Sequence, residues 1–155
     1  LILIGDGVLK SQLERQIVDN GLQDQVFILP YVPLEKYLRI LAGADIGIDF
    51  RTATSLNYDL ACSVRVVDYL SCRLPIITSN TLAFRDIESR YGVINCISDR
   101  LSIPQKGFHI ERTADYYFRN INSIRKLIED ALESEFSFET NLNKLENWLV
   151  EDGIL

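Results

Sequence analysis

The stretch Ser63-Val-Arg-Val-Val-Asp-Tyr-Leu-Ser-Cys-Arg-Leu-Pro-Ile-Ile-Thr78 is the part of this sequence that decides the fold. It predicts a short apolar helix, a tight turn and a buried strand from Leu74, near whose start Pro75 is tolerated. Asp68 lies in the middle of the apolar helix run. A carboxylate there is costly unless another group pairs with it or a site uses it, so Asp68 is the first candidate ligand contact.

Apolar runs and helical patterns alternate along the rest of the chain. Strands are predicted at 1–4, 26–29, 45–50, 74–78 and 93–97, and helices at 8–20, 33–43, 63 to about 72, 84–90, 114–132 and about 139–150. Residues 51–60 and 98–113 are predicted to be loops. Strands that alternate with helices indicate an α/β fold, a Rossmann-like parallel sheet with helices on both faces.

Length, charge and cysteine content narrow the class of protein. The 155 residues suit a single domain, and the net charge of −6 argues against a general nucleic-acid binder. No apolar run is long enough to span a bilayer, and no signal-peptide pattern is present. Cys62, Cys72 and Cys96 show no CxxC spacing, which favours reduced thiols of a cytoplasmic protein that serve as small buried hydrophobes. The start on a strand, in a sequence without Met, suggests a piece of a longer polypeptide.

Several familiar site motifs are incomplete. Gly5-Asp-Gly7 resembles part of a dinucleotide-binding fingerprint, but Lys10 stands where the third glycine belongs, which favours a simple strand-to-helix turn. No phosphate-binding P-loop is present, and no metal-ligand spacing. The one histidine, His109, falls in a predicted loop with nothing nearby in sequence to make it a general base.

Two arginines have both a functional and a structural interpretation. Arg51 directly follows the third strand, where its guanidinium could reach a phosphate at the carboxyl edge of the sheet or simply be solvated. Arg65 lies three residues before Asp68 on one helix, so the two could form a salt bridge instead of a ligand site.

Four pieces in order resemble the C-terminal, nucleotide-sugar-binding domain of the GT-B glycosyltransferases of family 4 (glycosyl transferases group 1). They are the runs at 1–7, 26–33 and 41–48 and the block 63–78, in which Arg65-Val-Val-Asp68-Tyr69 and Leu74-Pro75-Ile76-Ile77 match the family pattern. The resemblance covers residues 1–98 well and the final helices loosely. It implies one donor-binding domain over 1–155, half of a GT-B fold, without the domain's first strand and helix and without the N-terminal acceptor domain.

The resemblance also assigns donor-binding roles. The acid at the position of Asp68 holds the ribose hydroxyls, which suits a carboxylate because it can accept two hydrogen bonds from a vicinal diol. The other implied residues are Arg65; Tyr31, Val32 and Pro33 in the loop beside the base; and Arg51, Leu60, Ala61, Cys62 and Ser63 on the side of the diphosphate and sugar.

The chain departs from the family pattern in three respects. Many members carry two glutamates separated by seven residues, and counting back from Asp68 gives Leu60, with Asp59 one place off. The second acid is aspartate, which reaches less far than glutamate. The family's phosphate-binding Arg and Lys belong to a strand and loop that would precede Leu1.

The implied activity is transfer of a sugar from a nucleotide diphosphate sugar to an acceptor hydroxyl, in surface-polysaccharide or glycolipid synthesis. No metal or other cofactor is expected. The expected partners are the donor and, through the N-terminal domain, an acceptor saccharide or lipid. The expected location is the cytoplasm or the inner face of a membrane. Two alternatives stay open: a nucleotide-sugar epimerase of the same fold, and a non-catalytic partner or scaffold, which Leu60 at the acid position favours.

Overall fold

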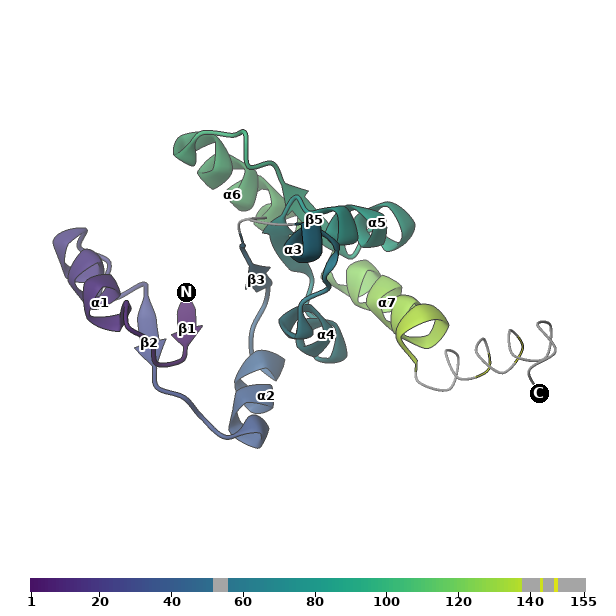
Figure 1. Cartoon of the computed structure of the whole chain (residues 1–155), viewed down its shortest axis with the longest axis horizontal. Coiled ribbons are helices and arrows are strands. Elements are labelled where there is room, and N and C mark those ends of the chain that lie inside the picture. The colour runs from purple at the N-terminus through teal and green to yellow at the C-terminus, as the bar shows by residue number, and fades with distance from the viewer. Residues whose placement is uncertain (52–55, 138–142, 144–146, 148–155) are drawn as a thin grey trace. The chain divides into compact units, whose positions relative to one another are not determined.

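The computed structural model describes residues 1–51, 56–137, 143 and 147 (Figure 1). The chain divides into two compact units, Leu1–Ile40 and Leu41–Leu155. All strand pairs in the described part are parallel, and strands alternate with helices along the chain. The predicted α/β, Rossmann-like class is therefore confirmed.

The first unit contains two parallel strands and the helix that connects them. Its elements are β1 (Ile2–Ile4), α1 (Lys10–Asp19) and β2 (Phe27–Leu29). Gly5 follows β1 with φ 145°, a backbone conformation that favours glycine, and its N–H donates to the Leu29 carbonyl at 3.0 Å. The Gly5-Asp-Gly7 motif is thus the tight strand-to-helix turn that the sequence favours. Helix α2 (Leu34–Ala42) follows Pro33 and continues into the second unit.

The residues of the second unit that the structure describes contain a three-stranded sheet that positions the candidate site. Its strands are β3 (Gly47–Asp49), β4 (Ile76–Ser79) and β5 (Ile94–Ile97), in the order β3-β4-β5. Every residue of the central strand β4 is buried. Asp49 is in register with Thr78, and Thr78 with Cys96, so the three strands end together at one carboxyl edge. In open α/β sheets this edge is where ligands bind.

Five α-helices in the described part of the second unit accompany this sheet. They are α3 (Leu56–Leu60), α4 (Val64–Ser71), α5 (Leu82–Tyr91), α6 (Ile103–Arg119) and α7 (Ile121–Ala131), followed by a π-helical turn, η1 (Leu132–Phe136). The core is built from fully buried apolar side chains of the strands, α4, α5 and α7, among them Val66, Leu70, Ile76, Ile77, Phe84, Val93, Ile94 and Ile128.

Helix α4 packs closely on β3. A Cβ atom at Gly47 would lie 2.5 Å from two ring atoms of Tyr69, so only glycine permits this approach. The Tyr69 hydroxyl donates to the Ile48 carbonyl at 3.1 Å. The helix, turn and strand predicted for 63–78 are thereby confirmed, with Arg73 (φ 58°) in the turn.

Two loop predictions were wrong. A short helix, α3, occupies the end of the predicted loop 51–60, and α6 begins at Ile103, inside the predicted loop 98–113. Pro104 is compatible with the first turn of a helix, where its missing N–H is not needed. The Ser102 N–H donates to Gln105 Oε1 at 2.9 Å, half of a capping box.

The helix predicted over 114–132 is two helices. Helix α6 ends just before Asn120, and α7 begins just after it. The side-chain amide of Asn120 donates to the Tyr116 carbonyl at 2.8 Å and so competes with the helical backbone pattern. His109, predicted in a loop, is an exposed residue of α6. The helix predicted from about 139 to 150 lies outside the described residues, 143 and 147 excepted.

Candidate functional site

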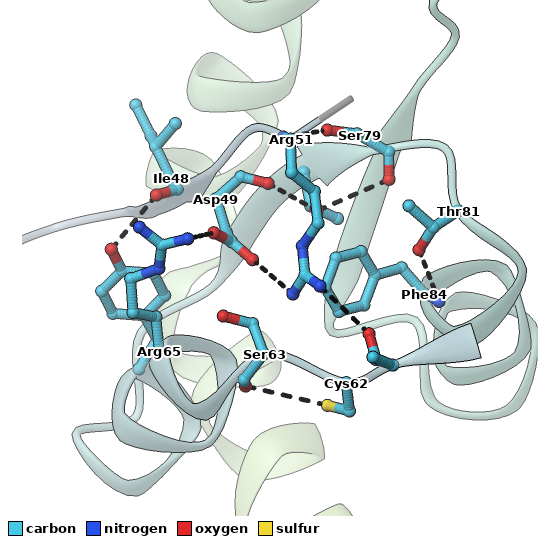
Figure 2. A network of polar contacts seen from close by, with 12 residues as sticks. Ile48, Asp49, Arg51, Cys62, Ser63, Arg65, Ser79, Thr81 and Phe84 are labelled. Atoms are coloured by element: carbon cyan, nitrogen blue, oxygen red, sulfur yellow. Dashed lines mark hydrogen bonds and ion pairs between the residues drawn. The ribbon is translucent and has the colours of Figure 1, made fainter. Parts of the chain in front are cut away.

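A buried carboxylate, Asp49, lies at the end of β3 between two guanidinium groups (Figure 2). Arg51 Nη2 donates to Asp49 Oδ2 at 3.1 Å, and Arg65 Nη2 lies 2.8 Å from Oδ1. The second contact is a charge contact, since Oδ1 makes no hydrogen bond of good geometry within the described residues. The Asp49 side chain is 0 % exposed, so both pairings offset the high cost of burying its charge.

The Asp49 cluster, defined as Asp49, Arg51 and Arg65, carries one net positive charge, because two arginines share one carboxylate. It lies at the carboxyl edge of the sheet: Asp49 ends β3, Arg51 follows the strand by two residues, and Arg65 is in the first turn of α4. A positive cluster at this edge is suited to an anionic ligand.

Arg51 is held on several sides. Its Nη1 donates to the Ala61 carbonyl at 3.2 Å, its backbone N–H donates to Ser79 Oγ at 2.6 Å, and its Cζ lies 4.9 Å from the centre of the Phe84 ring (Figure 2). Its side chain is 13 % exposed, which rules out the solvated loop residue that one interpretation of the sequence suggested. The contact with Ala61 joins the end of β3 to the segment that leads into α4.

Asp68 lies half-buried on α4 and influences its neighbours electrostatically. Burial raises the pKa of the Tyr69 hydroxyl; Arg65 lowers it, and Asp49 and Asp68 raise it further. Burial also raises the pKa of the Cys72 thiol, and the Asp68 charge adds to that shift. Arg65, the helical neighbour suggested as a partner for Asp68, has its guanidinium on Asp49.

The segment predicted to face a diphosphate leads from α3 into α4. Leu60, at the end of α3, and Cys62 are exposed. Ser63 is the N-cap residue of α4, and its side chain makes no capping hydrogen bond. Among these residues the structure brings Ala61 into contact with the Asp49 cluster.

Asp59, the carboxylate nearest the family's upstream acid, caps another helix. Its Oδ1 accepts the backbone N–H of Leu82 at 2.9 Å, at the start of α5. Thr81 is the N-cap of the same helix, and its Oγ1 accepts the Phe84 N–H at 3.4 Å. A carboxylate beside the first free N–H groups of a helix stabilises that helix, which gives Asp59 a structural role.

The loop predicted to contact a base, Tyr31 to Pro33, belongs to the first unit. Asp6, from the turn after β1, accepts the Tyr31 N–H on Oδ2 at 2.9 Å and the Lys10 ammonium on Oδ1 at 2.7 Å. Tyr31 is exposed, whereas Val32 is buried. The sequence interpretation gave Asp6 no role beyond the turn, yet this carboxylate fixes the first residue of the loop.

The Tyr31 amide is expected to report the titration of Asp6. Hydrogen bonds from Lys10 and from the Tyr31 backbone lower the Asp6 pKa below its ordinary 3.8. A lowered pKa means that the contact favours the folded loop above about pH 4 and is lost as the pH falls through the folded value. In an amide-detected NMR titration, the Tyr31 signal should move with a midpoint below 3.8 and stop moving in Asp6→Asn. A midpoint at or above the ordinary value would contradict the contact.

The thiols do not resemble catalytic nucleophiles. The three cysteines form no disulfide, and burial together with the Glu88 charge raises the pKa of Cys96 to about 12. A reactive thiol needs a lowered pKa instead. No cluster of three or more His, Cys, Asp or Glu side chains suited to a metal occurs within residues 1–51 and 56–137. None of the helices in that part of the chain has the length and apolar character needed to cross a membrane.

Comparison with known proteins identifies three glycosyltransferases that are similar to this chain. It is 27% identical over 150 residues to chitobiosyldiphosphodolichol beta-mannosyltransferase of Candida albicans. The matched region covers 96% of this chain and 30% of that protein. It is 26% identical over 113 residues to the UDP-glycosyltransferase TURAN of Arabidopsis thaliana (69% and 24%). It is 29% identical over 79 residues to the mannosyltransferase of the same name from Mus musculus (51% and 16%).

These similarities have a defined extent. The chain spans less than a third of the length of each of these relatives. No family model matches it. The resemblance to glycosyltransferases in general is confirmed by these relatives, and the assignment to family 4 stays a prediction.

Proposed function

We propose that this chain is the donor-binding part of a glycosyltransferase that moves a sugar from a nucleotide diphosphate sugar to an acceptor hydroxyl. The observation that carries the proposal is the Asp49 cluster, with its net positive charge, at the carboxyl edge of a parallel sheet. A nucleotide diphosphate is an anion, and this edge is where α/β sheets bind such ligands. The similarity to glycosyltransferases supports the reaction class.

In this proposal each part of the site has its own task. Asp68 accepts hydrogen bonds from the ribose hydroxyls. Arg51, Arg65 and the Leu60 to Ser63 segment lie on the side of the diphosphate and sugar. Positive charge beside the leaving diphosphate would stabilise it as the bond to the sugar breaks, which is the main electrostatic contribution to such a reaction.

The names of the relatives suggest the acceptor. Two of them transfer mannose and carry chitobiosyldiphosphodolichol in their names. We therefore propose a lipid-linked sugar as the acceptor of the parent protein, so that the reaction belongs to glycolipid synthesis at the cytoplasmic face of a membrane. The acceptor would be held by a part of the parent protein beyond this domain.

A non-catalytic partner or scaffold is the second candidate. It is favoured by Leu60, which stands exposed at the place of the upstream acid, while Asp59 caps α5. A donor domain without that acid would lack a contact to the transferred sugar.

Turnover by the parent protein separates these functions. UDP- and GDP-sugars are supplied with and without a lipid diphosphate oligosaccharide, and both sugar transfer and changes in the donor sugar are measured. Transfer should occur with the acceptor and fall roughly tenfold to hundredfold in Asp68→Ala, because hydrogen bonds to a charged group are lost. Asp115→Ala, at an exposed position of α6, is the matched control and should leave the rate unchanged.

Other outcomes would contradict the proposal. Conversion of the donor sugar without an acceptor would identify an epimerase. Absence of turnover in a folded parent protein would favour the scaffold.

A further inference from the structure

A pocket of about 290 Å³ opens at the carboxyl ends of the three strands in the second unit. Its lining includes Arg51, which follows β3 by two residues. Ser79 and Ile97, the last residues of β4 and β5, line it as well. Asp99 and Lys106 complete its polar lining; Lys106 comes from the first turns of α6. The pocket is close to the lower end of the size range of small-molecule sites.

The pocket is continuous with the Asp49 cluster through Arg51. This residue lines the pocket, pairs with Asp49 and donates to the Ala61 carbonyl. A ligand group in the pocket would therefore lie next to the segment that leads into α4.

The charges around the pocket leave an excess of positive charge. Two cations (Arg51 and Lys106) and one carboxylate (Asp99) line the pocket. The Asp49 cluster, to which Arg51 belongs, adds one further cation (Arg65) and one carboxylate (Asp49), so three cations stand against two carboxylates. Lys106 Nζ lies 3.9 Å from Asp99 Oδ1, too far for a hydrogen bond, so its ammonium donors are not taken up by that carboxylate. The side chain of Lys106 is 36 % exposed and that of Arg51 13 %, so Lys106 is the more accessible cation. This local excess contrasts with the net charge of −6 of the whole chain.

We propose that this pocket binds a phosphate group and that Lys106 contacts it directly, with Arg51 supplying charge at its floor. The inference rests on the proposed function, in which the phosphate belongs to the diphosphate of the donor, and it adds a cation from α6 to the arginines near β3 and α4. An ammonium suits this task because it acts as a compact charge with three donors.

Titration of the 155-residue chain with inorganic pyrophosphate tests this inference, with binding followed by amide-detected NMR. Lys106→Gln should weaken pyrophosphate binding about tenfold, because a charge-assisted contact is lost. Lys126→Gln removes the same charge from an exposed position of α7 and should change the affinity less than twofold. Binding should also weaken as salt is added.

Two results would overturn the assignment: no binding of pyrophosphate to the folded chain, or equal affinities for Lys106→Gln and Lys126→Gln. Parallel titration with UDP and GDP separates this inference from the proposed function. Nucleotide binding that requires Asp68 but not Lys106 would leave the donor function standing and refute the pocket. Pyrophosphate binding that requires Lys106, without binding of any nucleotide, would support the pocket and refute the donor function.

Discussion

Replacement of Asp49 by asparagine is expected to lower the free energy of unfolding by about 3 kcal/mol. Asparagine has nearly the same shape but no charge, so the change leaves Arg51 without its counter-ion at a site that is almost closed to solvent. Removing one partner of a buried ion pair is costly because the remaining charge has lost both water and its partner.

The loss of unfolding free energy should depend more on how deeply the substituted side chain is buried than on how many ion pairs it forms. Arg65→Gln should cost less than about 1 kcal/mol, because the Arg65 side chain is 60 % exposed and its contact is screened by water. Urea unfolding measures both changes. Asp45→Asn, at an exposed position just before β3, is the control and should stay within about 0.5 kcal/mol of the original chain. A loss for Asp49→Asn no larger than that of this control would contradict the paired, buried carboxylate.

Replacement of Phe84 by alanine is expected to cost about 3 to 5 kcal/mol. Phe84 is 0 % exposed, belongs to the core cluster and presents its ring to the Arg51 guanidinium. Truncation therefore removes apolar packing and leaves a cavity under the same arginine that Asp49 holds.

A conservative variant separates packing from the ring contact. Phe84→Leu keeps most of the apolar volume but loses the ring contact with Arg51. Its packing cost should be about 1.5 kcal/mol or less, and the loss of the ring contact adds to that cost. Phe108→Ala, at a residue of α6 that is 64% exposed, is the matched control and should have little effect. Urea unfolding again provides the measurement. Equal losses for Phe84→Ala and Phe108→Ala would contradict the assignment of Phe84 to the core.

Much of the fold could be predicted from the sequence because local patterns and tertiary packing agree. All five predicted strands are present, and Val66 and Leu70, four residues apart on α4, are both fully buried. The sequence does not predict the start of α6, because Pro104 in a polar stretch favours a loop, although Ser102 and Gln105 have the spacing of a capping box. Helix α3 has five residues, too few for a periodic pattern to stand out.

The candidate site was only partly predictable. Asp68 and Asp49 are both acids in apolar runs, and Arg51 follows Asp49 by two residues, so the reasoning applied to Asp68 could have identified Asp49 as well. The contact between Arg65 and Asp49 depends on how α4 packs on β3, which local spacing does not determine. A helical neighbour such as Asp68 is the only partner that spacing can suggest for Arg65.

The proposed donor site is tested most directly by saturation-transfer NMR of the 155-residue chain with UDP, GDP, ADP and CMP, repeated with Asp68→Ala. This method detects the weak binding expected of a single donor-binding domain. The account predicts that one nucleotide receives saturation at its ribose protons and that the signal disappears in a folded Asp68→Ala variant. Absence of binding by all four nucleotides to the folded chain, or a ribose signal unchanged in Asp68→Ala, would contradict it.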